Sequence, residues 1–576
     1  MSIAFPLLQI NELSIDFNAE GNITSGLQKV SILVNKGETV AIVGESGSGK
    51  SITSLSVLRL LPIPPAIITE GEILFSEDGI TQTNLLKLPD HEMKKIIGNK
   101  ISMIFQEPMT SLNPVFTCGD QVREAILLHQ HIGKTEARQS TIELFEKVQL
   151  PNPDLMFSRF PHQLSGGQKQ RVMIAMAMSC NPALLIADEP TTALDVTVQK
   201  TILQLISQLQ QQNSMGVIFI SHDLGIVAEI ADRIIVMYKG KIVEEGVTGD
   251  LLKHPKHPYT KSLLACRPQL HKKGERLPVV SDFLTVNADG SLSPKNGHLK
   301  PVKINNPETK AQKELISVNH LRVTYPLRKN LFGKTLENLH AVDNVSFQVY
   351  EGETLGLVGE SGCGKSTMGR AILRLIKPTS GSVYFKGRDV AAYSENELRK
   401  LRKEMQIVFQ DPYSSLNPRL TVGKAILEPL EVHHMLKNTD ERKSRVMELL
   451  KTVDLKESHY TRYPHEFSGG QRQRIVIARA LAVNPSFVIC DESVSSLDVS
   501  VQAQVLNLLN QLKQDLGFTV VFISHDLSVV RYISDRIMVM QEGKIVESGL
   551  AEDIYLSPQT EYTKRLISSI PKIKVY

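Results

Sequence analysis

The chain carries the same set of short motifs twice, and this internal repeat constrains its fold more than any other feature. The stretch "GESGSGKS" begins at Gly44 and "GESGCGKS" begins at Gly359, a displacement of 315 residues (359 − 44). Asp188 and Asp491 end two similar apolar runs at a displacement of 303 residues (491 − 188). Self-similarity of this kind indicates duplicated structural units. We therefore expect two domains that share one fold.

The chain length and the segment between the copies agree with this division. A chain of 576 residues exceeds what one hydrophobic core normally serves. The intervening segment contains "NADGSLSPKNGHLKPVKINNPETK", which is rich in Asn, Pro, Gly and Lys and poor in apolar periodicity, as exposed linkers are. We expect a first domain over residues 1–266, a linker over 267–313 and a second domain over 314–576.

Charge and cysteine content exclude several classes of protein. The balance of 65 basic against 61 acidic residues gives a net charge of +4, too small over this length to indicate a surface for nucleic acid or lipid. The cysteines lie far apart without a C-x-x-C pair, so we expect no disulfide framework, zinc site or iron–sulfur cluster. No stretch approaches 18 uninterrupted apolar residues, and the first residues lack a secretion signal, so we expect no membrane span. The cysteines are Cys118, Cys180, Cys266, Cys363 and Cys490.

Short apolar runs predict the sheet of each domain. "ETVAIVG" and "ETLGLVG" precede the glycine-rich loops, "ALLIADE" and "SFVICDE" end in paired acids, and "GVIFISHD" and "FTVVFISHD" end in a histidine. Continuous runs rich in β-branched residues suit strands buried on both faces, hence an α/β fold with a largely parallel sheet flanked by helices. The polar residues that end these runs then gather at one sheet edge, where open α/β sheets bind ligands. Two later runs, each interrupted by Lys-Gly or Glu-Gly, predict hairpins.

Each glycine-rich loop satisfies the pattern G-x-x-x-x-G-K-[ST]. Glycines let the backbone curl so that successive N–H groups surround phosphate oxygens, and the following helix adds its positive end. The lysine supplies a charge for the outer phosphates, and the serine hydroxyl can ligate Mg²⁺. The expected nucleotide-binding residues are Gly44, Ser46, Gly47, Ser48, Gly49, Lys50, Ser51 and Ile52, and in the second copy Gly359, Ser361, Gly362, Cys363, Gly364, Lys365, Ser366 and Thr367.

Paired acids follow the next strand in each copy. Asp188 and Asp491 suit the magnesium shell, whereas Glu189 and Glu492 can orient and deprotonate a water aimed at the γ-phosphate. Alone, such a pair is more often a solvated strand end or a helix cap. The phosphate loop beside the predicted strand favours the catalytic interpretation.

Four further polar residues recur in the same order. His222 and His525 follow the strands "IFIS" and "VFIS", and Gln106 and Gln410 stand in "IFQEP" and "VFQDP". Singly, such histidines are more often structural, and such glutamines are ordinary surface amides. Their repeated order along the chain favours a shared role at the phosphate site.

With "LSGGQ" and "FSGGQ" added to this order, the chain resembles ATP-binding cassette (ABC) ATPases over nearly its whole length outside the linker. The resemblance implies two tandem P-loop ATPase domains that use ATP and Mg²⁺. Each would have a mainly parallel core sheet, an antiparallel β subdomain and a helical subdomain carrying the signature motif SGGQ. In this family the signature of one domain closes over the ATP held by the other. A helix-cap role for SGGQ is compatible with such a grip.

The resemblance therefore implies two composite ATP sites, formed by head-to-tail pairing of the two domains within one chain. The histidines would hold the γ-phosphate and the attacking water, Asp195 and Asp498 would carry signals across the interface, and Phe17 and Tyr325 would stack on adenine. Because both copies keep the glutamate and the signature, we expect both sites to be active. Site one would combine Lys50, Ser51, Gln106, Asp188, Glu189 and His222 with Ser468, Gly470 and Gln471; site two would combine Lys365, Ser366, Gln410, Asp491, Glu492 and His525 with Ser165, Gly167 and Gln168. The expected Mg²⁺ ligands are Ser51, Gln106 and Asp188, and Ser366, Gln410 and Asp491.

A narrower resemblance concerns the transported solute. "EPMTSLNP", "DPYSSLNP" and "HPYTKSLLA" are similar to the peptide/nickel importer branch of the family. This implies an ATP-hydrolysing motor at the cytoplasmic face of the inner membrane, for import of dipeptides, oligopeptides, glutathione-like solutes or nickel. Its partners would be two integral-membrane permease subunits, seated near Gln106 and Gln410, and an extracytoplasmic solute-binding protein. Some relatives hold an iron–sulfur cluster in a cysteine-rich tail; that pattern is missing around Cys266 and beyond Tyr562, so we expect none.

The main alternative is a soluble duplicated ABC ATPase that acts on ribosomes or DNA without transport. Such proteins usually carry charged helical linkers, zinc inserts or basic arms, and the sequence has none of these. An exporter motor is disfavoured by the importer-like "SLNP" context. Co-purification of permeases, as opposed to ribosomes or DNA, separates the first two classes. The solute itself is not encoded in this chain.

Overall fold

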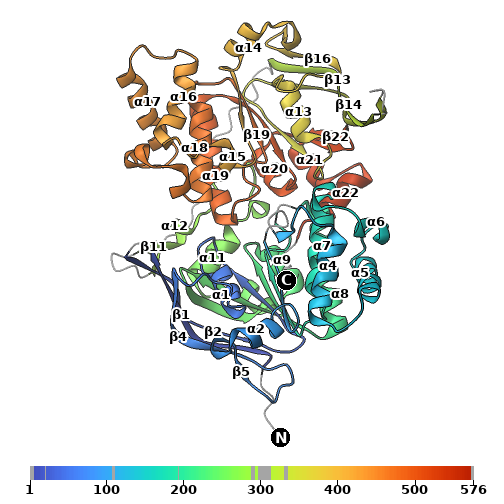
Figure 1. Ribbon diagram of the computed structural model, residues 1–576. Helices are drawn as coiled ribbons and strands as arrows, with labels where there is room; N and C mark the ends of the chain where they lie inside the picture. The colour runs from blue at the N-terminus through green and yellow to red at the C-terminus, as the bar shows by residue number, and fades with distance from the viewer. Residues whose placement is uncertain are drawn as a thin grey trace.

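The computed structural model describes residues 6–19, 21–106, 111–192, 194–286, 292–295, 313–329 and 335–571, which form two similar domains. The first is drawn blue to green and the second yellow to red in Figure 1, where one lies above the other. Three features recur in both: a core sheet, an antiparallel sheet and a group of helices. The fold class predicted from the repeat is confirmed.

Each core sheet has six strands, all parallel except the last strand of a terminal hairpin. The strand orders are β10-β9-β3-β8-β7-β6 and β18-β19-β20-β15-β21-β22. Every residue of the three central strands of each sheet is buried, as the continuous apolar runs predicted. The strands are β3 (Thr39–Val43), β6 (Ile101–Ile104), β7 (Leu184–Asp188), β8 (Gly216–Ser221), β9 (Arg233–Tyr238) and β10 (Lys241–Val247), and β15 (Thr354–Val358), β18 (Met405–Val408), β19 (Phe487–Asp491), β20 (Thr519–Ser524), β21 (Arg536–Gln541) and β22 (Lys544–Leu550).

A four-stranded antiparallel sheet covers the start of each domain. It buries Leu8 and Ile10 of its first strand in one cluster with Ile186 and Ile220 of the core sheet, so the two sheets share a core. The helix that follows the phosphate loop, α1 (Lys50–Val57) or α13 (Lys365–Ile372), contacts strands of both sheets. The strands are β1 (Leu8–Ala19), β2 (Asn22–Val34), β4 (Ala66–Phe75) and β5 (Thr83–Asn84), and β13 (Glu314–Lys329), β14 (Thr335–Tyr350), β16 (Ser380–Phe385) and β17 (Arg388–Asp389).

A group of helices follows β6 in the first domain and β18 in the second. Each group ends in the signature helix, which leads into β7 or β19. Glycines let these helices approach closely: a Cβ on Gly119 would lie 2.2 Å from the Phe157 ring, and one on Gly423 would lie 2.4 Å from the Tyr460 ring. The helices are α4 (Cys118–His129), α5 (Lys134–Lys147), α6 (Pro153–Phe157) and α7 (Gly166–Met178), and α15 (Pro412–Ser415), α16 (Val422–Val432), α17 (Thr439–Thr452) and α18 (Gly469–Leu481).

The remaining helices connect the core strands or follow them. They are α2 (Asp90–Ile96), α8 (Val196–Asn213), α9 (Leu224–Ile230), α10 (Thr248–Lys253), α11 (Pro258–Ala265) and α12 (Val280–Phe283), and α14 (Glu395–Leu401), α19 (Val499–Leu516), α20 (Leu527–Ile533), α21 (Ala551–Leu556) and α22 (Glu561–Ser568). Within the part of the chain that the structure describes, no helix combines the length and apolar character needed to cross a membrane.

The first part of the expected linker is buried, which corrects the prediction that this whole segment is exposed. Arg267, Leu277 and Val279 are 4%, 0% and 5% exposed. Leu277 and Val279 belong to the hydrophobic core of the second domain. The polar composition of the later linker masked these apolar residues in the sequence. A two-stranded hairpin, β11 (Leu284–Val286) with β12 (Leu292–Pro294), follows, while residues 287–291 and 296–312 lie outside the described residues.

Candidate active site between the two domains

The phosphate loops connect the first core strand to α1 or α13, at the edge predicted for ligand binding. Gly49 ends the first loop with φ 104°, and Gly364 ends the second with φ 108°. A Cβ on Gly364 would lie 1.9 Å from the carbonyl oxygen of Ala341, and one on Gly49 would lie 2.7 Å from Leu27. Both the backbone conformation and the lack of space therefore require glycine at the start of the helix.

The lysine of each loop is folded back into the loop itself. Lys50 Nζ donates to the carbonyl oxygens of Gly44 at 2.8 Å and Glu45 at 3.0 Å. Lys365 Nζ makes the same two bonds in the second loop, both at 2.8 Å. The two side chains are buried. A positive charge is thus held at the centre of a curled backbone, an arrangement that attracts phosphate.

The buried aspartates are suited to a divalent cation. Asp188 is 5% exposed, and its Oδ1 has no hydrogen-bond partner among the residues described. Burial raises the pKa of Asp188 to about 6, although a hydrogen bond from Ser51 and the charge of Lys50 oppose this. In the second domain Ser366 Oγ donates to Asp491 Oδ1 at 2.7 Å. A carboxylate beside a hydroxyl is a ligand set that Mg²⁺ accepts, so these residues fit the metal that the family uses.

The glutamates sit at the ends of β7 and β19 with their backbone turned to positive φ, 47° at Glu189 and 48° at Glu492. Such angles are uncommon outside glycine and are often found at functional sites. Gln106 Nε2 donates to Glu189 Oε2 at 3.0 Å, and Gln410 Nε2 donates to Glu492 Oε2 at 2.8 Å. The predicted glutamines therefore meet the glutamates, and their role as Mg²⁺ ligands stays a prediction.

Each histidine pairs with the glutamate of its own domain. His222 Nδ1 lies 3.2 Å from Glu189 Oε1, and His525 Nδ1 lies 3.3 Å from Glu492 Oε2. Burial acts against the charge on both members of the first pair. The close approach and mutual attraction of the two groups outweigh burial, so the pKa of Glu189 lies below its ordinary value and the pKa of His222 lies above it. The result is an ionised carboxylate held in place beside the phosphate loop.

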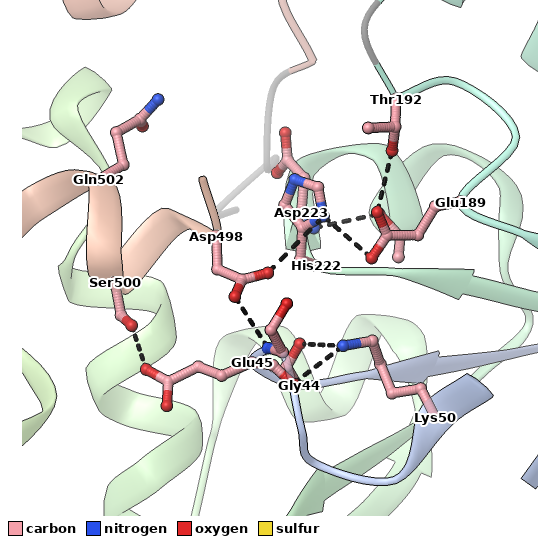
Figure 2. Close-up of polar contacts among 12 residues, drawn as sticks. Gly44, Glu45, Lys50, Glu189, Thr192, His222, Asp223, Asp498, Ser500 and Gln502 are labelled. Atoms are coloured by element: carbon pink, nitrogen blue, oxygen red, sulfur yellow. Dashed lines mark hydrogen bonds and ion pairs between the residues drawn. The ribbon is translucent and has the colours of Figure 1, made fainter. Parts of the chain in front are cut away.

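The second domain contributes directly to the first phosphate loop (Figure 2). The backbone N–H of Ser46 donates to Asp498 Oδ2 at 2.8 Å, and Asp498 Oδ1 lies 4.0 Å from His222 Nδ1. Ser500 Oγ donates to the carboxylate of Glu45. Residues more than 450 positions apart thus meet at one loop. Site one is built from both domains.

The second phosphate loop lacks this contact. Asp195, which corresponds to Asp498, accepts a hydrogen bond from Val198 N at 2.9 Å and so caps its own helix α8. Asp498 makes no such bond to its own helix. The carboxylate of Glu360 instead lies 3.6 Å from Arg565 of its own domain. Among the residues described, no hydrogen bond joins Asp195 to the second loop, so the two sites differ.

Comparisons with known proteins agree with this geometry. The family profile described as "ABC transporter" matches residues 27–192 and 342–495, which include both phosphate loops and both glutamates. The chain belongs to the ABC transporter family. A second profile, "Oligopeptide/dipeptide transporter, C-terminal region", matches residues 243–283 and 546–575. The chain is thus an ATP-binding and ATP-hydrolysing subunit of the peptide-type importers within this family.

Similar proteins include the glutathione import ATP-binding proteins GsiA of several bacteria. The one from Salmonella choleraesuis (strain SC-B67) is 48% identical, over 98% of this chain and 89% of that protein. The one from Escherichia coli (strain K12) is 47% identical over the same shares. Among solved structures, a dimeric ATP-binding cassette, MJ0796, bound to ADP and Pi, is 33% identical over 41% of this chain and 99% of that one, with a TM-score of 0.38.

In this ABC transporter subunit the two signature motifs cap their helices. Ser165 Oγ accepts from Gln168 N at 3.3 Å while Gln168 Oε1 accepts from Ser165 N at 3.0 Å, a capping box. Ser468 and Gln471 repeat it. Within the described ranges no hydrogen bond joins either signature to the opposing phosphate loop. The predicted grip of Ser468, Gly470 and Gln471, and of Ser165, Gly167 and Gln168, on ATP therefore stays a prediction.

A cavity of about 120 Å³ lies between the domains. Glu189 and His222 line it from the first domain, and His525 and Asp526 line it from the second. Polar side chains from both domains, among them predicted catalytic residues, therefore face one partly open cavity at the interface.

The candidate adenine platforms lie beside the phosphate loops. Phe17 of β1 packs over Gly26, where a Cβ would lie 2.6 Å from its ring, and the carbonyl of Gly26 lies against Gly49. Tyr325 of β13 is 37% exposed and pairs with Leu339 on β14, the strand whose Ala341 abuts Gly364. Both aromatic residues are on the strand next to the one that contacts the loop, and their stacking on adenine stays a prediction.

Sequence reasoning missed two supports of the loops. The hydroxyl of Tyr259 on α11 accepts from Glu45 N at 3.0 Å, and the hydroxyl of Tyr562 on α22 accepts from Glu360 N at 3.1 Å. These tyrosines are 303 residues apart (562 − 259), so the repeat displacement could have paired them. Ser500 was also missed, because nothing in the sequence brings it to the first domain.

Proposed function

We propose that this chain powers the import of small peptides, of peptide-like solutes such as glutathione, or of nickel. The observation that carries the proposal is the composite site, in which Asp498 of one domain contacts the phosphate loop of the other. The names of the similar proteins and the match to a peptide-transporter C-terminal region support the solute class.

At each site different residues of the chain carry out different parts of ATP hydrolysis. Glu189 or Glu492 orients the attacking water and accepts its proton, and the paired histidine keeps that carboxylate ionised. The loop lysine and backbone N–H groups bind the phosphates. Mg²⁺, when bound by Asp188 with Ser51 or by Asp491 with Ser366, would neutralise charge that develops on the phosphates. Ser468 and Ser165 would complete the sites when the domains close.

The proposed partners are two integral-membrane permease subunits and an extracytoplasmic solute-binding protein, with this chain at the cytoplasmic face of the inner membrane. A groove of about 380 Å³ follows Gln410 and is lined by Tyr413, Leu416 and Arg479. Tyr413 is 64% exposed, and its ring lies 3.7 Å from the Arg472 guanidinium. A permease helix seated here would reach Glu492 through the hydrogen bond of Gln410. The matching residues 107–110 of the first domain lie outside the described residues.

Uptake assays in a strain lacking the gene test the solute. Labelled glutathione, dipeptides, longer peptides and Ni²⁺ would be compared after return of the wild-type chain or of the double variant Glu189→Gln with Glu492→Gln. We expect uptake of one solute class with the wild type only, and co-purification of permease subunits with both forms. Ribosomes or DNA in place of permeases, or uptake of every solute unchanged by the double variant, would contradict the proposal.

The composite sites have a separate test. In a Glu492→Gln background only site one is expected to hydrolyse ATP. There Ser468→Ala is expected to lower ATPase turnover, whereas Ser165→Ala is not. In a Glu189→Gln background the two serines exchange roles. Equal effects of both serines in both backgrounds would show that the signatures do not act across the interface.

A further inference from the structure

Residues 267–279, which we call the strap, leave the first domain and bury themselves against the second. Leu277 is fully buried and Val279 is 5% exposed, both in the same core cluster as side chains of α19 and α20. In Figure 1 the helix that follows the strap, α12, lies at the boundary between the two domains. The strap is therefore an interdomain contact made by the chain itself.

Hydrogen bonds fix the strap to two helices of the second domain. The side-chain amide of Asn507 on α19 accepts from Leu277 N at 2.9 Å and donates to Leu277 O at 2.8 Å. The hydroxyl of Tyr532 on α20 donates to Glu275 O at 2.8 Å. Asn507 thus satisfies both backbone groups of one strap residue, as a neighbouring strand would. The contact is specific in register because a shift of one residue breaks all three bonds.

A partly exposed ion pair adds to this attachment. Lys273 of the strap pairs with Asp535, which also lies 3.5 Å from Lys513 and accepts a hydrogen bond from Thr354 N at 2.8 Å. The Lys273 and Asp535 side chains are 22% and 42% exposed, so solvent screens the pair and its contribution to the attachment is modest. The buried Leu277 and the three hydrogen bonds are therefore the main attachment of the strap.

The side chains that bond to the strap, Asn507 and Tyr532, are not repeated at the matching positions of the first domain. The displacement of 303 residues between the copies places different side chains at the matching positions of the first domain. Asn507 corresponds to Gln204, Lys513 to Gln210 and Tyr532 to Glu229. The described residues therefore show this set of bonds on the second domain and not on the first.

The helix that the strap holds is the helix that reaches site one. Asp498 and Ser500, at the start of α19, contact the first phosphate loop, and Asn507 lies on the same helix. Nine residues of helix span ~14 Å, a distance over which a helix is rigid. On the other side α8 is held to α22 of the second domain by a bond from Lys200 Nζ to the carbonyl oxygen of Ser568 at 3.3 Å, and Asp195 there caps its own helix. In the described residues the helix that the strap holds makes the loop contact, and α8 does not.

We propose that the strap is a positioning element for site one: by fixing α19 it holds Asp498 on the loop of Ser46 without nucleotide. Among the described residues site two has no such element, and we expect it to assemble when ATP binds. Asn507 and Tyr532 are positioning residues, since they act on ATP through α19. The proposal rests on the composite ATP sites assigned above, and it makes the two sites unequal although both have a complete set of catalytic residues.

Disulfide cross-linking measures this geometry without relying on catalysis. The pair Ser46→Cys with Asp498→Cys reports site one, and Ser361→Cys with Asp195→Cys reports site two. Both are made in a chain carrying Cys363→Ser, because the first loop has serine at that position. Without nucleotide we expect fast cross-linking at site one and slow cross-linking at site two. ATP should accelerate cross-linking at site two and leave the rate at site one nearly unchanged.

The anchor variant Asn507→Ala with Tyr532→Phe is expected to slow cross-linking at site one by about tenfold, because the preassembled fraction falls. The matched control, Gln204→Ala with Glu229→Gln on the first domain, is expected to leave both rates within twofold. Equal rates for the anchor variant and its parent, or equally fast cross-linking of both sites without ATP, would overturn the proposal.

A milder variant guards against loss of folding. Lys273→Gln leaves Asp535 paired with Lys513. It is expected to slow cross-linking at site one by about threefold, with an unchanged melting temperature. No slowing in this folded variant would count against the strap. Failure of uptake with cross-linking as expected would instead refute the proposed transport function and leave the strap in place.

Discussion

Asp188 is a buried carboxylate whose charge destabilises the nucleotide-free protein, so Asp188→Asn is expected to stabilise the first domain at neutral pH. The side chain is 5% exposed and one carboxylate oxygen has no hydrogen-bond partner in the described structure. Burial raises its pKa from 3.8 to about 6. A shift of about two pKa units corresponds to roughly 3 kcal/mol, an upper bound because asparagine must also be accommodated.

The sign of the pH dependence follows from this shift. Between pH 4 and 6 the folded protein holds a proton on Asp188 that the unfolded chain has released, so the stability of the parent falls as pH rises through this window. The full penalty is reached about one pH unit above the folded-state pKa, near pH 7. Asparagine does not titrate, so the advantage of the variant is small near pH 4 and reaches its maximum above pH 7.

Calorimetry in EDTA without nucleotide measures the effect. For a gain of about 2 kcal/mol we expect the unfolding temperature of the first domain to rise by roughly 4–8 °C at pH 7.5 and by less at pH 5. ATPase activity of site one should be lost in the same variant. Asp491, whose pKa burial also raises, provides the control, because Asp491→Asn is expected to move the transition of the second domain. A lower unfolding temperature at pH 7.5, or a gain independent of pH, would refute the reasoning.

Three further outcomes can be checked directly. Glu189→Gln and Glu492→Gln should each lower ATPase turnover and together abolish it; unchanged turnover in the first with complete loss in the second would mean that site one is inactive. Gly423→Ala should reduce the free energy of unfolding by about 1–3 kcal/mol in urea titrations, since its Cβ would lie 2.4 Å from the Tyr460 ring. Tyr259→Phe should lower it by about 1 kcal/mol, because the hydroxyl that accepts from the loop backbone is removed, and an unchanged urea midpoint would contradict this.

The core sheet and the residues at its edge could be predicted from the sequence because their signals are local. Continuous apolar runs identify β3, β7 and β8 as buried strands, and the polar residue that ends each run then lies at one edge. The pairing of Glu189 with His222 follows from parallel strands that end side by side. Each of these patterns occurs twice in the sequence, once in each domain, which strengthened the prediction.

The contacts between domains could not be predicted in the same way. Ser500 reaches Glu45, and Leu277 reaches Asn507, across separations of 455 and 230 residues, and no local pattern encodes such a distance. The strap was also missed, because its few apolar residues, such as Leu277 and Val279, lie in a segment that is polar on average. The asymmetry at Asp195 and Asp498 has the same origin, because the two aspartates occupy equivalent positions in the repeat and differ only in what packs around them.

Joining both halves of each ATP site in one polypeptide changes the kinetics of their encounter. The approach of Asp498 to the loop of Ser46 is a first-order event, governed by an effective molarity set by the tether, on the order of millimolar for short flexible connections. Specific ATPase activity is then independent of dilution. A half from one such chain also has little opportunity to exchange with a half from a paralogous transporter in the same cell.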